Sequence, residues 1–315
     1  MSSAPFSHRP VMVDEVVALL AGGPAGTVLD ATIGGGGHAA ALLDARDDID
    51  VLGLDQDADA LAAAADRLGR FGARARLRHA RFDRLGDVVD ELGVGPLAGA
   101  LFDLGVSSPQ LDRAERGFSY RADAPLDMRM DRTAGRTAFD VVNTYDEAAL
   151  ARIFAANGEG KFGRRIARAI IAARPVDTTT QLADTVRDAI PAAARRTGGH
   201  PAKRVFQAVR IEVNSELDVL PLALDETIDR LAAGGRCVAL AYHSGEDRIV
   251  KDRFLQAESG GCACPPLLPC GCGAVRTVRL LNRGSRKPSA AEIAENPRAE
   301  SARLRAVERL LDSSP

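Results

Sequence analysis

Short apolar runs alternate with amphipathic stretches along the first hundred residues of the chain. Apolar residues from Val13 to Leu20 recur at helical spacing and predict an opening helix. Strands are expected at residues 28–30, 51–55, 74–79 and 97–105, and helices at 38–45, 57–69 and 87–92. This alternation is typical of an α/β fold in which helices cover a parallel sheet.

The strand rhythm stops near residue 107, and only helical patterns follow until residue 214. A long helix is then expected over residues 215–231, ended by Gly234 and Gly235. The later elements are predicted as a strand over 236–243, a helix over 246–256 and a strand over 274–281. Residues 301–311 fit either a seventh strand or a terminal helix.

A glycine-rich turn follows the first predicted strand, where residues 30–38 read D-A-T-I-G-G-G-G-H. Four consecutive glycines let the backbone approach a ligand closely, and the N–H groups of the next helix face the same space. A flexible loop would also explain a glycine run, but Asp55 ends the second strand, where an acid can bind both hydroxyls of a ribose. The turn lacks the patterns of dinucleotide and triphosphate sites. Adenosine without a required phosphate suggests S-adenosylmethionine.

Four side chains fall at or near the ends of the first four predicted strands: Asp30, Asp55, Phe82 and Asp103. Carboxyl ends of parallel strands meet at one edge of the sheet, where ligands bind. Any single acid there could be a cap or a solvated turn residue. The alignment of all four favours a binding site.

Composition adds limits to this picture. The chain has 315 residues and no Trp, and aromatic residues make up 4%, so the core must consist mainly of Ala, Leu and Val. Neither a membrane-spanning apolar run nor a hydrophobic signal core is visible, and we expect a soluble, cytoplasmic protein.

Positive charge is concentrated in one segment. Residues 161–210 contain eleven basic and three acidic residues, a charge of +8, whereas the whole chain carries −2 and the remainder therefore −10. Solvated helix faces would explain single arginines, but the cluster favours a surface that contacts RNA phosphates. The basic residues are Lys161, Arg164, Arg165, Arg168, Arg174, Arg187, Arg195, Arg196, Lys203, Arg204 and Arg210.

Four of the five cysteines form a C-x-C-x5-C-x-C pattern in a Pro- and Gly-rich loop over residues 262–272: Cys262, Cys264, Cys270 and Cys272. Four thiols at this spacing could enclose one zinc ion, but surface thiols are the alternative, and no metal is needed for the chemistry inferred below. We therefore assign no metal ligand from the sequence. Cys237 is expected to be a small buried hydrophobe in a strand.

Two stretches resemble the bacterial MraW/RsmH family, whose members methylate N4 of a cytosine in small-subunit ribosomal RNA. They are the turn T-x-G-x-G-G-H at residues 32–38 and D-L-G-V-S-S-P-Q-L-D at 103–112. Gly245 departs from the family, which usually has leucine there, and we expect a looser entry into the next helix. Further matching motifs are E-R-G-F-S at 115–119, P-L-D-M-R-M-D at 125–131, R-I-A-R-A-I at 165–170, H-P-A-K-R at 200–204, F-Q-A-V-R-I at 206–211, N-S-E-L at 214–217 and N-P-R at 296–298.

The resemblance implies a Rossmann-like class I S-adenosylmethionine-dependent methyltransferase sheet of residues 1–106 and 215–315. A helical substrate-recognition domain of residues 107–214 would be inserted after the fourth strand. The first half of 301–311 would be a strand. The implied substrate is a cytidine of 16S ribosomal RNA near the decoding centre, within the small subunit. The implied cofactor-binding residues are Gly36, Gly37, His38, Asp55, Phe82, Asp103 and Gln110, and the candidate RNA-binding residues are Lys161, Arg164, Arg165, Arg168, Lys203 and Arg204.

Asp103 is the candidate catalytic residue. Cytosine N4 is a poor nucleophile, so the enzyme must align it with the sulfonium methyl and accept a hydrogen bond from the amine. The base must also leave its stack to reach a buried methyl group. Methylation at C5 would require a cysteine, and none lies between Asp103 and Gln110. Two alternatives stay open: Asp103 could instead hold the cofactor, and His38 could be a helix-start residue facing solvent.

Two other function classes fit the same fold. A methyltransferase for a small molecule or a protein would have the same sheet, because function depends on the site and not on the fold. A non-catalytic cofactor-binding scaffold is the second, although the intact glycine turn and Asp55 argue against it.

Overall fold

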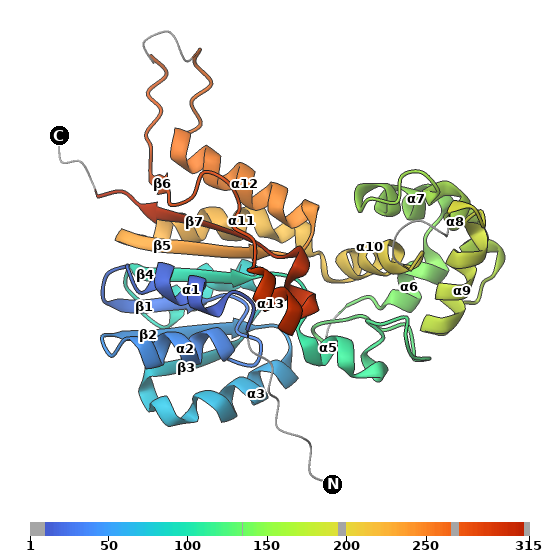
Figure 1. Cartoon of the computed structure of the whole chain (residues 1–315), viewed down its shortest axis with the longest axis horizontal. Coiled ribbons are helices and arrows are strands. Elements are labelled where there is room, and N and C mark those ends of the chain that lie inside the picture. The colour runs from blue at the N-terminus through green and yellow to red at the C-terminus, as the bar shows by residue number, and fades with distance from the viewer. Residues whose placement is uncertain (1–9, 134, 195–199, 266–270, 312–315) are drawn as a thin grey trace. The chain divides into compact units, whose positions relative to one another are not determined.

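The computed structural model describes residues 10–133, 135–194, 200–265 and 271–311 (Figure 1). The chain forms two compact units. The sheet unit comprises the described residues up to Gly105 and those from Leu217 onward, and the helical unit spans Val106–Glu216. Among the described residues, no helix combines the length and the apolar composition needed to cross a membrane.

The sheet unit is built on seven strands in the order β3-β2-β1-β4-β5-β7-β6. The first five in this order are parallel, and β7 is antiparallel to both of its neighbours. The predicted Rossmann-like α/β class is confirmed, and the antiparallel β7 makes the sheet mixed at this edge. The strands are β1 (Gly26–Asp30), β2 (Ile49–Asp55), β3 (Ala75–His79), β4 (Leu97–Asp103), β5 (Leu231–Ala241), β6 (Val278–Leu280) and β7 (Arg303–Arg309).

Helices cover both faces of the sheet because successive strand residues point to opposite sides. Val28 and Leu101 belong to the core beneath α1 (Val13–Leu20), α2 (Gly37–Ala45) and α3 (Ala58–Leu68). Leu29 and Phe102 belong to the core beneath α4 (Leu85–Glu91), α11 (Glu216–Arg230) and α12 (Ser244–Ser259). The remaining elements of this unit are α13 (Ala290–Glu295) and the 3-10 helices Gly69–Arg74, Phe82–Arg84 and Pro297–Ser301.

Several element boundaries differ from the sequence prediction. Helix α11 ends at Arg230, and Gly234 and Gly235 lie inside β5 instead of ending the helix. A Cβ on Gly235 would lie 2.8 Å from the Leu97 carbonyl oxygen, so the glycine serves strand packing where the ladder shifts register. Strand β6 is shorter than expected, and residues 303–309 form a strand.

The looser helix entry expected at Gly245 is also wrong. Helix α12 begins at Ser244, and His243 caps it, because the His243 Nδ1 atom accepts from the backbone N–H of Gly245 at 3.2 Å. A Cβ at Gly245 would lie 3.1 Å from the His243 ring and 3.2 Å from Leu217. The segment is therefore close-packed around a glycine.

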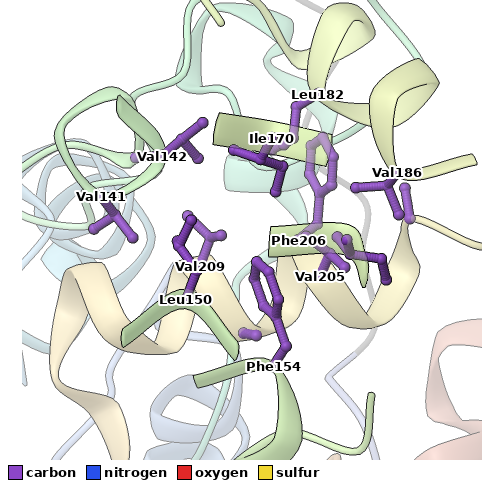
Figure 2. Close-up of a cluster of buried hydrophobic side chains, with 14 of the residues drawn as sticks. Val141, Val142, Leu150, Phe154, Ile170, Leu182, Val186, Val205, Phe206 and Val209 are labelled. Atoms are coloured by element: carbon purple, nitrogen blue, oxygen red, sulfur yellow. The ribbon is translucent and has the colours of Figure 1, made fainter. Parts of the chain in front are cut away.

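The helical unit has its own hydrophobic core, shown in Figure 2. Phe154 of α7 (Glu147–Ala156), Ile170 of α8 (Gly163–Ala172) and Phe206 of α10 (Lys203–Asn214) are among its buried side chains. The Asn214 side chain fixes an irregular segment to the end of α10, since its Oδ1 accepts from Met130 N at 2.8 Å. The elements are α5 (Ser108–Asp112), the 3-10 helix Ala114–Arg116, α6 (Ala138–Thr144), α7 (Glu147–Ala156), α8 (Gly163–Ala172), α9 (Thr179–Ala189) and α10 (Lys203–Asn214).

Candidate active site

The strand order of the sheet reverses at β1, which pairs with β2 on one side and β4 on the other. In open α/β sheets, ligands bind beyond the carboxyl ends of the strands at such a reversal. Asp30, Asp55 and Asp103 are the last residues of β1, β2 and β4. The sheet unit therefore brings three acids to the place where a ligand is expected.

The turn after β1 is tied to both neighbouring strands. The Gly34 N–H donates to Asp55 Oδ2 at 2.9 Å, and the Asp103 N–H donates to Thr32 Oγ1 at 2.7 Å. Gly36, at φ +72°, is the N-cap of α2, and a Cβ there would lie 3.1 Å from Leu68. The turn therefore needs glycine at this position, both for its left-handed backbone and for its closeness to α3.

The carboxyl group of Asp55 is held by the backbone on both oxygens. Oδ2 accepts from Gly34, and Oδ1 accepts from Asp57 N at 2.9 Å. Burial raises the pKa of Asp55 to about 6, against the opposing effect of these backbone hydrogen bonds. The backbone N–H of Gln56 also lowers the pKa of Asp55, so three backbone groups act on a carboxylate that offers about four acceptor sites.

Asp30 is more deeply buried than Asp55, with 3% of its surface exposed. It accepts a hydrogen bond from Thr32 N at 3.2 Å. Burial raises the pKa of Asp30 to about 8, and the nearby carboxylates of Asp103 and Asp55 act in the same direction. Near neutral pH, most Asp30 side chains therefore carry a proton.

Asp103 is held between two aromatic side chains. The Tyr242 hydroxyl donates to Asp103 Oδ1 at 2.7 Å, and His38 Nδ1 lies 3.6 Å from Asp103 Oδ2. Burial, followed by the charge of Asp103, raises the pKa of Tyr242 well above its usual value, which keeps the phenol a donor. Asp103 Oδ2 is therefore the oxygen directed away from this strong hydrogen bond.

His38 is buried in the first turn of α2, so the alternative that it faces solvent is wrong. Its Nε2 lies 2.9 Å from the Val11 carbonyl oxygen. A carbonyl only accepts, so Nε2 must carry the hydrogen, and Nδ1 is the ring atom that faces Asp103. Its predicted role in cofactor binding stays a prediction.

Two further predicted cofactor-binding residues, Phe82 and Gln110, do not lie in strands. Phe82 begins a short 3-10 helix after β3 and packs edge-to-face against Phe102, with ring centroids 5.9 Å apart. Gln110 belongs to the helical unit, where it is buried and its Oε1 accepts from Ser107 N at 2.9 Å. Gln110 is thus part of the cap of α5, and its contact with a cofactor stays a prediction.

The basic segment separates into two groups. Arg174, Arg187 and Arg210 are engaged locally: Arg174 with the Val142 and Tyr145 carbonyls, Arg187 with Asp184 and Asp188, and Arg210 with Glu216. Arg195 and Arg196 lie outside the described residues. The six candidate RNA-binding residues are all exposed on or beside α8 and at the start of α10: Lys161, Arg164, Arg165, Arg168, Lys203 and Arg204.

Ion pairing differs within this exposed group. Arg168 lies 3.8 Å from Glu147 and Arg204 lies 3.6 Å from Glu159. The other four, Lys161, Arg164, Arg165 and Lys203, make no ion pair with any residue that the structure describes.

Tyr242 and Thr32 are site residues that the sequence analysis did not single out. Tyr242 follows the last residue of β5, the same kind of position that marked Asp30, Asp55 and Asp103. Extending the strand-end rule to the fifth strand would have found it. Thr32 had no comparable signal, because its role depends on the position of β4 beside the turn.

The sequence matches the MraW methylase family over residues 5–310. It is 54% identical over 309 residues to ribosomal RNA small subunit methyltransferase H of Frankia alni, covering 96% of this chain and 95% of that protein. It is 53% identical over 315 residues to the protein of the same name from Thermobifida fusca, covering 98% and 94%. A solved rRNA methylase from Streptococcus thermophilus is similar with a TM-score of 0.43 and 13% identity, over 99% of both chains.

Proposed function

The chain belongs to the MraW methylase family, and we propose that it transfers the methyl group of S-adenosylmethionine to N4 of a cytidine in 16S ribosomal RNA, near the decoding centre. The observation that carries this proposal is the carboxylate of Asp103. It stands at the strand reversal of a family methylase, with one oxygen fixed by Tyr242. Relatives about half identical over nearly their whole length are named small-subunit RNA methyltransferases.

The cofactor would be held by the elements around β1. Gly36 and Gly37 provide a turn without side chains at the start of α2, and the carboxylate of Asp55, fixed by backbone N–H groups, would accept from the ribose hydroxyls. Phe82 offers an aromatic face beside β3 for the adenine. His38 would contact the methionine end, and Gln110 is also proposed to contact the cofactor.

The three acids at the strand ends favour a positively charged ligand. S-adenosylmethionine supplies a methyl group already activated by its positive sulfonium. Asp30, Asp55 and Asp103 are close enough that Asp103 and Asp55 raise the pKa of Asp30. A positive ligand beside these carboxylates would offset their mutual repulsion.

Asp103 would act on the target amine. Attack by N4 places positive charge on the nitrogen, and the amine must then lose one proton. We assign Asp103 Oδ2 as the acceptor of a hydrogen bond from N4 and of that proton, because Oδ1 already accepts from Tyr242 at 2.7 Å. The other role of Asp103, holding the cofactor, is separated from this one by the first variant in the Discussion.

The helical unit would bind the RNA backbone. Its six exposed basic side chains provide contacts to phosphates, which set affinity and position but do not read the sequence. The four that make no ion pair among the described residues are the ones that can bind a phosphate without first breaking an ion pair within the protein.

The test is methyl transfer from labelled S-adenosylmethionine to four acceptors: small subunits and naked 16S RNA from cells lacking this gene, free cytidine and total protein. Mass mapping of the labelled RNA should find one methyl group on N4 of one cytidine. Labelling of protein or of a free nucleoside would support the other substrate classes. Absence of turnover with cofactor still bound would support a scaffold.

A further inference from the structure

A long loop joins α12 to β6 and is not explained by the methyl-transfer site. It spans residues 260–277, and its described residues form no helix or strand. Loops longer than about 12 to 15 residues without secondary structure are uncommon in compact domains unless they carry a function. Contacts that hold the two arms of this loop together therefore bear on its function.

The base of the loop is closed by a backbone contact. Gly260, the C-cap of α12, has φ +64°, and a Cβ there would lie 2.4 Å from the Val275 carbonyl oxygen. Closer to β6 and α12, Arg276 Nε donates to the Glu258 carbonyl at 2.9 Å. The two arms therefore leave the sheet side by side, as Figure 1 shows beyond α12 and β6.

This closure places thiols opposite one another. Cys262 and Cys264 lie on the arm that follows Gly260, and Cys272 lies on the arm that precedes Val275. The three Sγ atoms all lie within 4.8 Å of one another. In a tetrahedral zinc site with bonds of about 2.3 Å, sulfur atoms are about 3.8 Å apart, so shifts of about 1 Å would complete the geometry.

We propose that Cys262, Cys264 and Cys272 bind a zinc ion that holds the two arms of this loop together. The group contains only thiols, and soft sulfur ligands favour zinc over magnesium or calcium. Cys270, the remaining cysteine of the pattern, lies outside the described residues, and the site rests on the other three. Because loop and metal lie beside the edge strand β6, the ion is a structural clamp.

Each thiol that binds zinc loses its proton. Zinc binding to the metal-free protein should therefore release protons, and calorimetry in buffers of different ionisation enthalpy measures their number. Thiols that merely lie near one another would release none on addition of zinc.

The experiment uses the full chain without a histidine tag, purified under reducing conditions without chelator. We expect about one equivalent of zinc by elemental analysis. Cobalt added to the metal-free protein should give the thiolate-to-cobalt charge-transfer band. Cys264→Ser should lose most of the zinc and weaken that band, whereas Cys237→Ala, which changes the buried cysteine of β5, should keep both.

Circular dichroism of Cys264→Ser should match the parent chain, which separates metal loss from unfolding. Two outcomes would overturn the site. One is metal-free protein that neither takes up zinc nor gives the cobalt band while its thiols are reduced. The other is a Cys264→Ser variant that retains a full equivalent of zinc.

Discussion

The hydroxyl of Tyr242 donates a 2.7 Å hydrogen bond to Asp103 Oδ1, although the two residues are 139 positions apart in the sequence. They meet because β4 and β5 are parallel neighbours in which Asp103 pairs with Leu240. One oxygen of the proposed catalytic carboxylate is thereby fixed, and the other lies 3.6 Å from His38 Nδ1.

Replacing Tyr242 with Phe removes this donor and keeps the ring. Hydrogen bonds to charged groups contribute about 1.5 to 3 kcal/mol, so we expect kcat to fall about tenfold to a hundredfold. If Asp103 acts on the target amine, the affinity for S-adenosylmethionine should stay nearly unchanged in calorimetry. A large loss of cofactor affinity with little change in kcat would assign Asp103 to cofactor binding instead.

Asp55→Ala should weaken cofactor binding strongly. The substitution removes the acceptor proposed for both ribose hydroxyls and leaves the Gly34 and Asp57 N–H groups without their carboxylate. A loss of about 1.5 to 3 kcal/mol corresponds to roughly tenfold to a hundredfold in Kd. Asp59→Ala, which changes an exposed acid in the first turn of α3, is the matched control. Equal Kd values for the two variants would contradict the role of Asp55.

Asp30 should make the ligand-free protein less stable as pH rises. Its pKa is about 8 when folded and 3.8 ordinarily, so the folded state keeps a proton that the unfolded chain has already lost. This contribution is fully present below pH 3.8 and is lost as pH rises through about 8.

Asp30→Asn keeps an acceptor for Thr32 but does not titrate. Urea unfolding of both proteins between about pH 5 and 8 measures the effect as the difference in unfolding free energy. We expect the parent chain to lose stability relative to the variant by up to about 1.4 kcal/mol per pH unit. A constant difference across this range would show that Asp30 is ionised throughout.

Reversing charge at Arg164, Arg165 and Lys203 together should weaken binding of small subunits and flatten its salt dependence. Fewer phosphate contacts release fewer counterions, so the slope of log affinity against log salt decreases in magnitude. Cofactor affinity should barely change. Filter binding across a salt series provides the slope, and calorimetry provides the cofactor affinity.

The control for this triple variant reverses Arg70, Arg84 and Lys251, three exposed residues of the sheet unit, and changes net charge equally. If both triple variants lost the same affinity, overall charge would be responsible and the basic residues of α8 and α10 would be an ordinary solvated surface. Loss of cofactor binding in the first variant would show that the helical unit supports the fold.

Much of the sheet could be predicted because its signals are local. The alternation of apolar runs located β1 to β4, and each of their acids could be placed at a strand end from neighbouring residues alone. The direction of β7 could not be predicted, because the same alternating pattern fits a parallel or an antiparallel neighbour. Gly234 and Gly235 were misleading, since a glycine pair after a helix usually ends it, whereas here Gly235 accommodates the Leu97 backbone across the ladder.

The site was predictable only as far as strand ends could be aligned. Asp55 and Asp103 follow from that rule, but the contact of Asp103 with Tyr242 requires that β5 lie beside β4 after a long excursion of the chain. The orientation of His38 depends on the Val11 carbonyl, which belongs to the segment before α1. Contacts of this kind have no signature within any sequence window.

The insertion between β4 and β5 has a consequence for synthesis on the ribosome. Strands β1 to β4 emerge first, and β4, with six of its seven residues buried in the folded chain, then has no partner on the side that β5 will occupy. At about 5 to 20 residues per second, the 139 positions from Asp103 to Tyr242 take roughly 7 to 28 s. The helical unit can fold during this interval, while the backbone groups of β4 that will pair with β5 stay unpaired. The nascent chain is therefore most vulnerable to aggregation after its first third is complete, and a chaperone that binds apolar strands would act at that stage.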